Sequence, residues 1–84
     1  MSKATYRKTI AKAMRLARTA ARKTQADVAA VLGLSQVQVS RLEAGAHPWT
    51  VEAMRQACDF YGVRMSDVLA VAQTSTIADG VAAA

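Results

Sequence analysis

Residues 24–45 read TQADVAAVLGLSQVQVSRLEAG, and this stretch decides the fold. Thr24 and Ser35 each precede a short run with helical spacing of its apolar residues, and both are residue types that cap helix N-termini. Gln38 follows Ser35 at the spacing of a capping box, in which two unpaired backbone donors are satisfied reciprocally. Gly33 lies between the two runs, where a residue without a Cβ can adopt the left-handed conformation that ends a helix. The stretch therefore predicts two short helices joined by a tight turn.

Three further helices are expected around this pair, because prolines and glycines are sparse and strand-type alternation is absent. The first runs roughly from Arg7 to Arg22. The fourth follows a Thr50 cap and is stopped by Gly62, and a short fifth follows a Ser66 cap. The predicted fold class is therefore all-α with five helices. Its inward positions are Ile10, Ala13, Met14, Ala17, Ala21, Val28, Ala29, Leu32, Val39, Leu42, Val51, Met54, Cys58, Tyr61, Val68 and Leu69.

The chain is expected to form one folded domain with two short flanking segments. Its 84 residues suffice for a single core, and the proportions of hydrophobic residues, 52%, and charged residues, 20%, are those of a globular domain. Residues 1–6 are expected to form an N-terminal arm and residues 7–72 the domain. Residues 73–84 lack a helical stripe, so they form either a loose tail or a segment that docks on a partner.

Positive charge is concentrated at one end of the chain. Residues 1–23 hold eight basic residues and no acid, for a charge of +8, whereas the remainder carries −3, giving the net charge of +5. A segment of this kind indicates a polyanionic partner, with nucleic acid ahead of a membrane surface. The basic residues supply a field that releases counterions on binding.

Several function classes are excluded by the residues that are missing. Cys58 is the only cysteine, so no disulfide forms within the chain, and a buried place for this thiol is expected. No apolar run approaches the ~18 residues of a membrane span, and no secretory signal is visible, so a cytoplasmic location is expected. Paired carboxylates, a nucleophile with a base and a metal-ligand cluster are all absent. The chain is therefore not expected to be an enzyme or to need a metal or cofactor.

The segment from Leu16 to Leu69, 54 of the 84 residues, resembles the phage-repressor type (Cro/repressor, XRE-like) helix-turn-helix domain. The resemblance is carried by Thr24-Gln25, Ala29 at the helix crossing, Gly33 in the turn, Val39 and Leu42 in the packing, Glu43-Ala44-Gly45 at the close, and then Tyr61-Gly62-Val63 and Ser66-Asp67-Val68-Leu69. It implies a bacterial or phage-encoded, repressor-like fold whose third helix enters the major groove of double-stranded DNA.

Inward-facing Val39 and Leu42 leave four residues of the third helix facing outward. The expected base-reading residues are Gln36, Val37, Ser40 and Arg41. Gln36 can pair with adenine and Arg41 with guanine, while Val37 either meets a thymine methyl or is incidental exposed surface. The expected DNA-backbone residues are Gln25, Ser35, Gln38, Arg15, Arg22, Lys23 and His47, with the amide of Ala46 beside them; Gln38 has capping as its other role.

The resemblance also implies a structural ion pair and a dimer. Arg18 and Glu43 match family positions that join the first helix to the end of the recognition helix. One reading helix specifies only a few base pairs, so a homodimer on a roughly palindromic operator is expected, with half-sites ~34 Å apart. The expected dimer interface is Val68, Leu69 and Val71.

The leading interpretation is a sequence-specific transcriptional regulator, with repression the expected mode. Two alternatives stay open. An antitoxin would fold its tail beyond Gln73 on a toxin, and a protein-interaction adaptor would use the basic first helix and not Gln36 or Arg41. Trp49 is open between a place in the core and a place in an interface.

Overall fold

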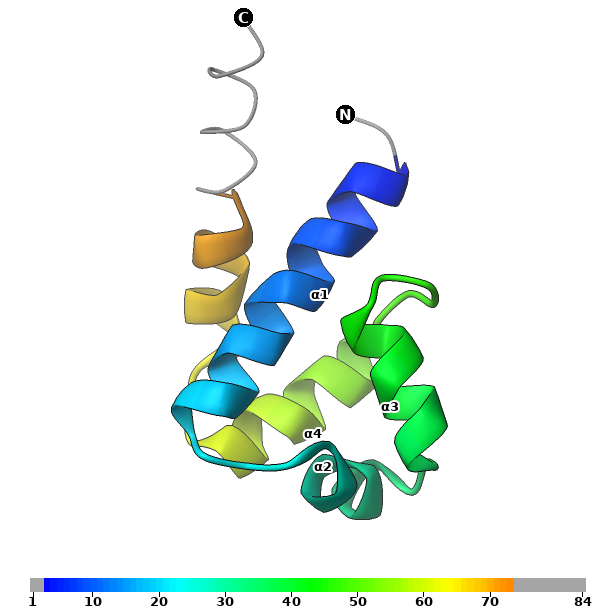
Figure 1. Cartoon of the computed structure of the whole chain (residues 1–84). Helices are drawn as coiled ribbons and strands as arrows, with labels where there is room; N and C mark the ends of the chain where they lie inside the picture. Colours follow the sequence, from blue (N-terminus) through cyan, green and yellow to red (C-terminus); the bar gives the residue numbers. More distant parts are fainter. Residues whose placement is uncertain (1–2, 74–84) are drawn as a thin grey trace, which may run out of the picture.

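The computed structural model describes residues 3–73 of the chain, all of whose regular structure is helical. Four helices are α1 (Lys3–Ala20), α2 (Gln25–Leu32), α3 (Gln36–Glu43) and α4 (Val51–Tyr61). A fifth helical segment covers residues 65–73. Figure 1 shows α3 on one side of α1 and the segment 65–73 on the other, with α2 and α4 packed beneath. The predicted all-α fold with five helices is confirmed.

Both short helices begin at a reciprocal cap. The Thr24 hydroxyl accepts a hydrogen bond from the Asp27 amide at 3.0 Å, and the Asp27 carboxylate accepts one from the Thr24 amide at 2.9 Å. Ser35 and Gln38 repeat this arrangement at 3.1 and 2.8 Å. Asp27 thus completes a capping box, a role beyond the favourable charge near the helix dipole that the sequence predicts. Local sequence therefore fixes where α2 and α3 start.

All five helical segments contribute residues to a single core. Met14, Val28 and Val39 are fully buried, and they bring α1, α2 and α3 to a common centre. Cys58 is buried in the same core, as expected. Trp49 is 9% exposed, so of its two expected places it occupies the core in the monomer. Val51 is a correction: it is 67% exposed as the first residue of α4, and the buried side of this helix begins one turn later, at Met54.

The ends of the helices depart from the sequence expectations in three places. α1 begins at Lys3, so residues 3–6 are helical and not an arm. It ends at Ala20 because Arg22 adopts a left-handed conformation with φ 59°, and the Lys23 amide then bonds to the Arg18 carbonyl at 3.1 Å. The last segment is helical from residue 65, and the Arg64 carbonyl accepts its first hydrogen bonds. Ser66 is therefore inside the first turn and is not the cap.

The expected tail falls almost wholly beyond the described residues. Its first residue, Gln73, is still helical. The remaining residues, 74–84, lie outside the part of the chain that the structure describes, as do residues 1–2.

Candidate DNA-binding surface

α3 has one buried face and one exposed face. Val39 is fully buried and Leu42 is 8% exposed, so the helix is anchored through these two side chains. The four residues expected to face outward, Gln36, Val37, Ser40 and Arg41, are all exposed. Val37 is 59% exposed although it is apolar. The surface therefore presents an amide, a hydroxyl, a guanidinium and a branched methyl group, which are the groups that can contact base edges in a major groove.

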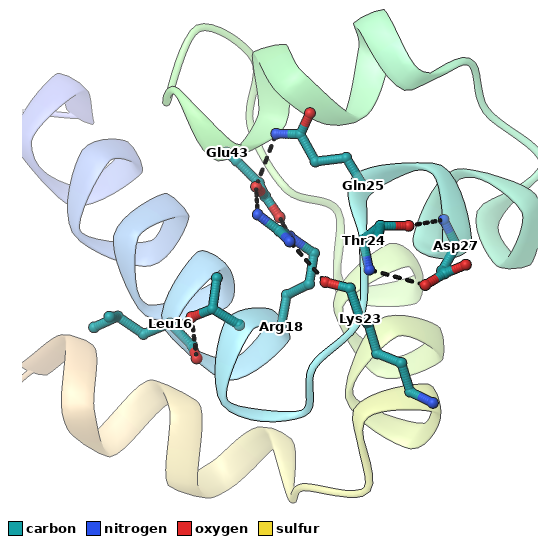
Figure 2. Close-up of polar contacts among 8 residues, drawn as sticks. Leu16, Arg18, Lys23, Thr24, Gln25, Asp27 and Glu43 are labelled. Carbon is teal, nitrogen blue, oxygen red and sulfur yellow. Dashed lines mark hydrogen bonds and ion pairs between the residues drawn. The ribbon is translucent and has the colours of Figure 1, made fainter.

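A buried polar network holds the C-terminal end of α3 against α1, as Figure 2 shows. The Arg18 guanidinium donates from Nε to Glu43 Oε2 at 2.6 Å and from Nη2 to Glu43 Oε1 at 3.0 Å. Its Nη1 donates to the carbonyl of Lys23 at 2.7 Å. The side chains of Arg18 and Glu43 are only 13% and 2% exposed. The Arg18–Glu43 pair implied by the resemblance is therefore present and bidentate, the geometry for which the planar guanidinium is suited.

Gln25 takes part in the same network. It is the first residue of α2, and its Nε2 donates to Glu43 Oε1 at 3.1 Å. Glu43 thus accepts hydrogen bonds from both α1 and α2. The sequence analysis expects Gln25 at the DNA backbone and gives no signal of this contact, because the two residues are 18 positions apart and meet only through the fold.

The network and the burial around it shift the pKa values of Arg18 and Tyr61. The hydrogen bond to Glu43 raises the pKa of Arg18, so this charge is permanent at any pH that the fold survives. Burial raises the pKa of the Tyr61 hydroxyl, and the Glu43 carboxylate adds to the increase. Within the described residues, the buried Tyr61 hydroxyl and Trp49 Nε1 have no hydrogen-bond partner. The charges of Arg18 and Glu43 are neutralised by each other, so the network positions α3 and contributes little net field.

Two expected backbone-contact residues already have structural roles. Ser35 and Gln38 are exposed but form the capping box of α3, so the capping role of Gln38 is present in the structure. His47 is exposed in the loop after α3. The Ala46 amide is a correction to the expectations: it donates to the Arg41 carbonyl at 3.0 Å and is engaged in ending the helix.

The three expected cations of the first segment lie in different environments. Arg15 and Arg22 are exposed. Lys23 is half-buried, and its ammonium group lies 4.8 Å from the centroid of the Phe60 ring. This cation–π contact draws Lys23 toward α4, a position that the sequence did not suggest.

The expected dimer residues are divided by the fold. Val68 was expected both inward and at the dimer interface: it is 5% exposed and belongs to the monomer core beside Ala13 and Ala17 of α1, so the inward position is confirmed and the interface position is corrected. Leu69 is half-buried and Val71 is 50% exposed. Val71 and the 48% exposed Leu16 of α1 line a groove of about 340 Å³ together with Ala13, Ala17, Val63, Asp67 and Val68. Leu16 was missed because it lies outside the buried stripe of α1.

Other kinds of site find no support in residues 3–73. His, Cys, Asp and Glu side chains do not gather anywhere in this range in a group of three that could hold a metal ion. The Cys58 thiol is buried, and burial raises its pKa. None of the described helices is long and apolar enough to cross a membrane.

Two short capped helices joined by a glycine turn, the second with a polar exposed face, define a helix-turn-helix protein, a class that binds DNA. The helix-turn-helix domain family matches residues 10–72, three quarters of the chain, so this protein belongs to that family.

Among solved structures, the chain is similar to the clp gene regulator ClgR from Corynebacterium glutamicum, in two crystal structures. One has a TM-score of 0.84 at 25% identity, covering 90% of this chain and 81% of that chain. The other has a TM-score of 0.78 at 27% identity, covering 83% and 91%. A search of curated proteins gives no match.

Proposed function

We propose that this protein is a sequence-specific transcriptional regulator of the phage-repressor type, which binds a palindromic operator as a homodimer. The observation that carries the proposal is the exposed face of α3. The side chains of Gln36 and Arg41 form no hydrogen bond or ion pair among the interactions described, and Val39 and Leu42 anchor the helix behind them. The similarity to a solved gene regulator supports the regulatory part.

Each exposed residue of α3 is assigned a role by its chemistry. Arg41 donates two hydrogen bonds to O6 and N7 of a guanine, and Gln36 pairs with N6 and N7 of an adenine. Each such pair discriminates against a wrong base by about 1–3 kcal/mol. Val37 packs against a thymine methyl, and Ser40 contacts a base edge or an adjacent phosphate.

The DNA backbone is held by groups that flank α3. Arg15, Arg22 and His47 are exposed, and they supply phosphate contacts that carry no sequence information. Ser35 and Gln25 stand at helix N-termini, where backbone donors and the helix dipole favour an anion. Gln25 contacts a phosphate only by sharing or leaving Glu43.

The homodimer is proposed to form through the exposed apolar surface beside the segment 65–73. Leu69 and Val71 remain from the expected interface, and Leu16 joins them across the groove. Val71→Glu should shift the protein toward monomer in sedimentation experiments without unfolding it, because this side chain is half exposed. A variant that stays dimeric would place the interface elsewhere. Repression follows if the occupied operator overlaps a promoter.

The deciding experiment is selection of bound duplexes from a random pool with wild type, Arg41→Ala and Arg55→Ala. Arg55 is a matched control, because it is an exposed arginine on α4 that pairs with Glu52 at 2.7 Å. Wild type and Arg55→Ala should enrich the same inverted repeat, and Arg41→Ala should lose preference at one base pair in each half-site. Enrichment of no sequence by wild type would overturn the proposal, and an unaltered preference in Arg41→Ala would remove that residue from its role.

A further inference from the structure

The two edges of α1 carry different chemistry. Ala11 is buried and Arg18 bonds to Glu43, so these two residues mark the edge of α1 that faces α3. Lys8 and Arg15 are both exposed and lie one helical step further around on that side, seven residues apart. The opposite edge, with Ala13, Leu16 and Ala17, is apolar and lines the groove beside the segment 65–73.

The N-terminal turns of α1 lie beside the loop that follows α3. A Cβ placed on Gly45 would lie 3.0 Å from Cγ of Lys8 and 3.2 Å from its Cα, so the backbone of α1 touches this loop directly. Figure 1 shows the N-terminal half of α1 and the loop after α3 at the same end of the molecule. Lys12 is exposed one turn after Lys8, on the solvent side of it. Lys8 is therefore held near the C-terminal end of the proposed recognition helix, and Lys12 follows it by one turn on the exposed side of α1.

The N-terminal turns of α1 also extend beyond the residues that match the helix-turn-helix family. The helix-turn-helix match begins at residue 10, whereas α1 begins at Lys3. Residues 1–23 contain no acid, and the acid of α3, Glu43, is buried and neutralised by Arg18. The surface that runs from the loop after α3 onto the basic edge of α1 is consequently cationic. From Lys8 to Arg15 this edge is about 10 Å long at 1.5 Å per residue.

We propose that Lys8 and Lys12 form an additional phosphate-binding site, which contacts the DNA backbone outside the base pairs read by α3. This inference rests on the proposed function. The two ammonium groups bind phosphates flanking the half-site, so the protein covers more DNA than it reads. Two phosphate contacts steepen the fall of log affinity with log salt by about two per protomer.

The test compares wild type with a Lys8→Gln/Lys12→Gln variant on two duplexes. One duplex ends at the last base pair that selection enriches, and the other carries about one further helical turn, ~10 base pairs, on each side. Arg55→Gln/Arg64→Gln is the matched control, because it removes the same charge from exposed arginines next to acids on their own elements. Thermal unfolding of all three proteins checks that the exposed substitutions leave the fold intact.

We expect wild type and the arginine control to bind the flanked duplex more tightly than the short one. The lysine variant should match the control on the short duplex, gain nothing from the flanks and show a salt dependence that is shallower by about two per protomer. An undiminished gain from the flanks in the lysine variant would overturn the inference and leave the proposed function standing, as would an equal loss in the control. If wild type enriches no sequence, the proposed function fails and this inference fails with it.

Discussion

α2 and α3 have the same length, eight residues, and the same reciprocal cap, yet they present different outward faces. The exposed positions of α2 include Ala26, Ala30 and Val31, which offer almost no hydrogen-bonding groups. Those of α3 include Gln36 and Arg41. The residues that cap a short helix and pack it against the core are therefore separate from the residues on its exposed face. The function resides in these exposed side chains, which the fold does not need.

The C-terminal ends of the two helices differ as well. α2 ends at Gly33, with φ 67° and open space around it. α3 ends with the buried Glu43, followed by Gly45 against α1. The helix proposed to read DNA is thus fixed at its C-terminal end by tertiary contacts, whereas α2 is closed by a local turn. Such anchoring limits the orientations that the exposed face can adopt.

The largest effect is expected from Glu43→Ala, because this substitution removes the tertiary contact that fixes the C-terminal end of α3. The C-terminal end of α2 is closed by a local turn instead. Arg18 would keep its charge in a largely buried place, and Gln25 would lose its acceptor. The free energy of unfolding should fall by about 3 kcal/mol, as measured by urea titration, because an unpaired buried charge is costly.

The control for this loss is the double variant Arg18→Met/Glu43→Met. It leaves no unpaired charge behind, so its free energy of unfolding should fall less than that of Glu43→Ala. A double variant that loses as much as the single one would mean that an unpaired buried charge is not the cause of the loss.

The second effect contrasts the outer faces. Arg41→Ala on α3 should cost about 1–3 kcal/mol of discrimination at one base pair, measured by titrating wild type and variant with single-base changes of the selected duplex. Val31→Ala on α2 removes a 42% exposed side chain and should leave the same discrimination unchanged. Equal changes from both substitutions would break the comparison and bring α2 into the reading surface.

The third effect contrasts Gly33, which ends α2, with Gly45, which follows α3. Gly33→Ala should lower the free energy of unfolding by about 1–2 kcal/mol, which is the cost of a left-handed backbone for an L-residue, since its Cβ would meet nothing within 4 Å. Gly45 has φ 78°, and a Cβ at this position would also press on Lys8. Gly45→Ala should therefore lower the free energy of unfolding by more than Gly33→Ala. Chemical unfolding of both variants measures the difference, and equal losses would show that α1 yields to the added methyl group.

The smallest effect is a pH dependence of the stability, which should differ between the Thr24–Asp27 cap of α2 and the Ser35–Gln38 cap of α3. Hydrogen bonds from the Thr24 backbone and side chain hold the pKa of Asp27 below its ordinary value of 3.8, whereas Gln38 in the other cap does not titrate. A lowered pKa contributes stability that is present above the unfolded-state pKa and is lost as the pH falls through the folded-state value. The stability advantage of wild type over Asp27→Asn should therefore shrink on acidification below 3.8.

The matched control for the pH experiment is Gln38→Ala, whose difference from wild type should stay constant over the same acid titration. Calorimetry of the three proteins gives both differences. A wild-type advantage over Asp27→Asn that is independent of pH would show that the carboxylate gains nothing from its cap.

Local signals in the sequence sufficed for the caps and turns. Thr24, Ser35 and Thr50 cap helices as predicted, and Gly33 and Gly62 end them with positive φ, because these effects involve residues at most a few positions apart. The same reasoning failed at Ser66, where a serine of suitable type lies inside the first turn. A cap residue permits a helix start and does not impose one.

For the candidate site, periodicity sufficed to divide the exposed from the buried residues of α3. Val39 and Leu42 set the direction of the helix, and the outward position of Gln36 and Arg41 follows from 3.6 residues per turn. Periodicity placed Val68 among the inward positions, but it could not decide whether this apolar side chain packs in the monomer core or in the expected dimer interface. Packing against α1 decides it.

The sequence by itself determined the helical class, the turn between α2 and α3 and the face that α3 turns outward, because each depends on spacing over one or two helical turns. Only the tertiary structure decided that Gln25 joins Arg18 on Glu43 and that Lys8 touches Gly45. The physical reason is that these residues are 18 or more positions apart, so their contacts exist only once the helices pack. The same packing placed Lys8 beside the loop that follows the helix proposed to read DNA.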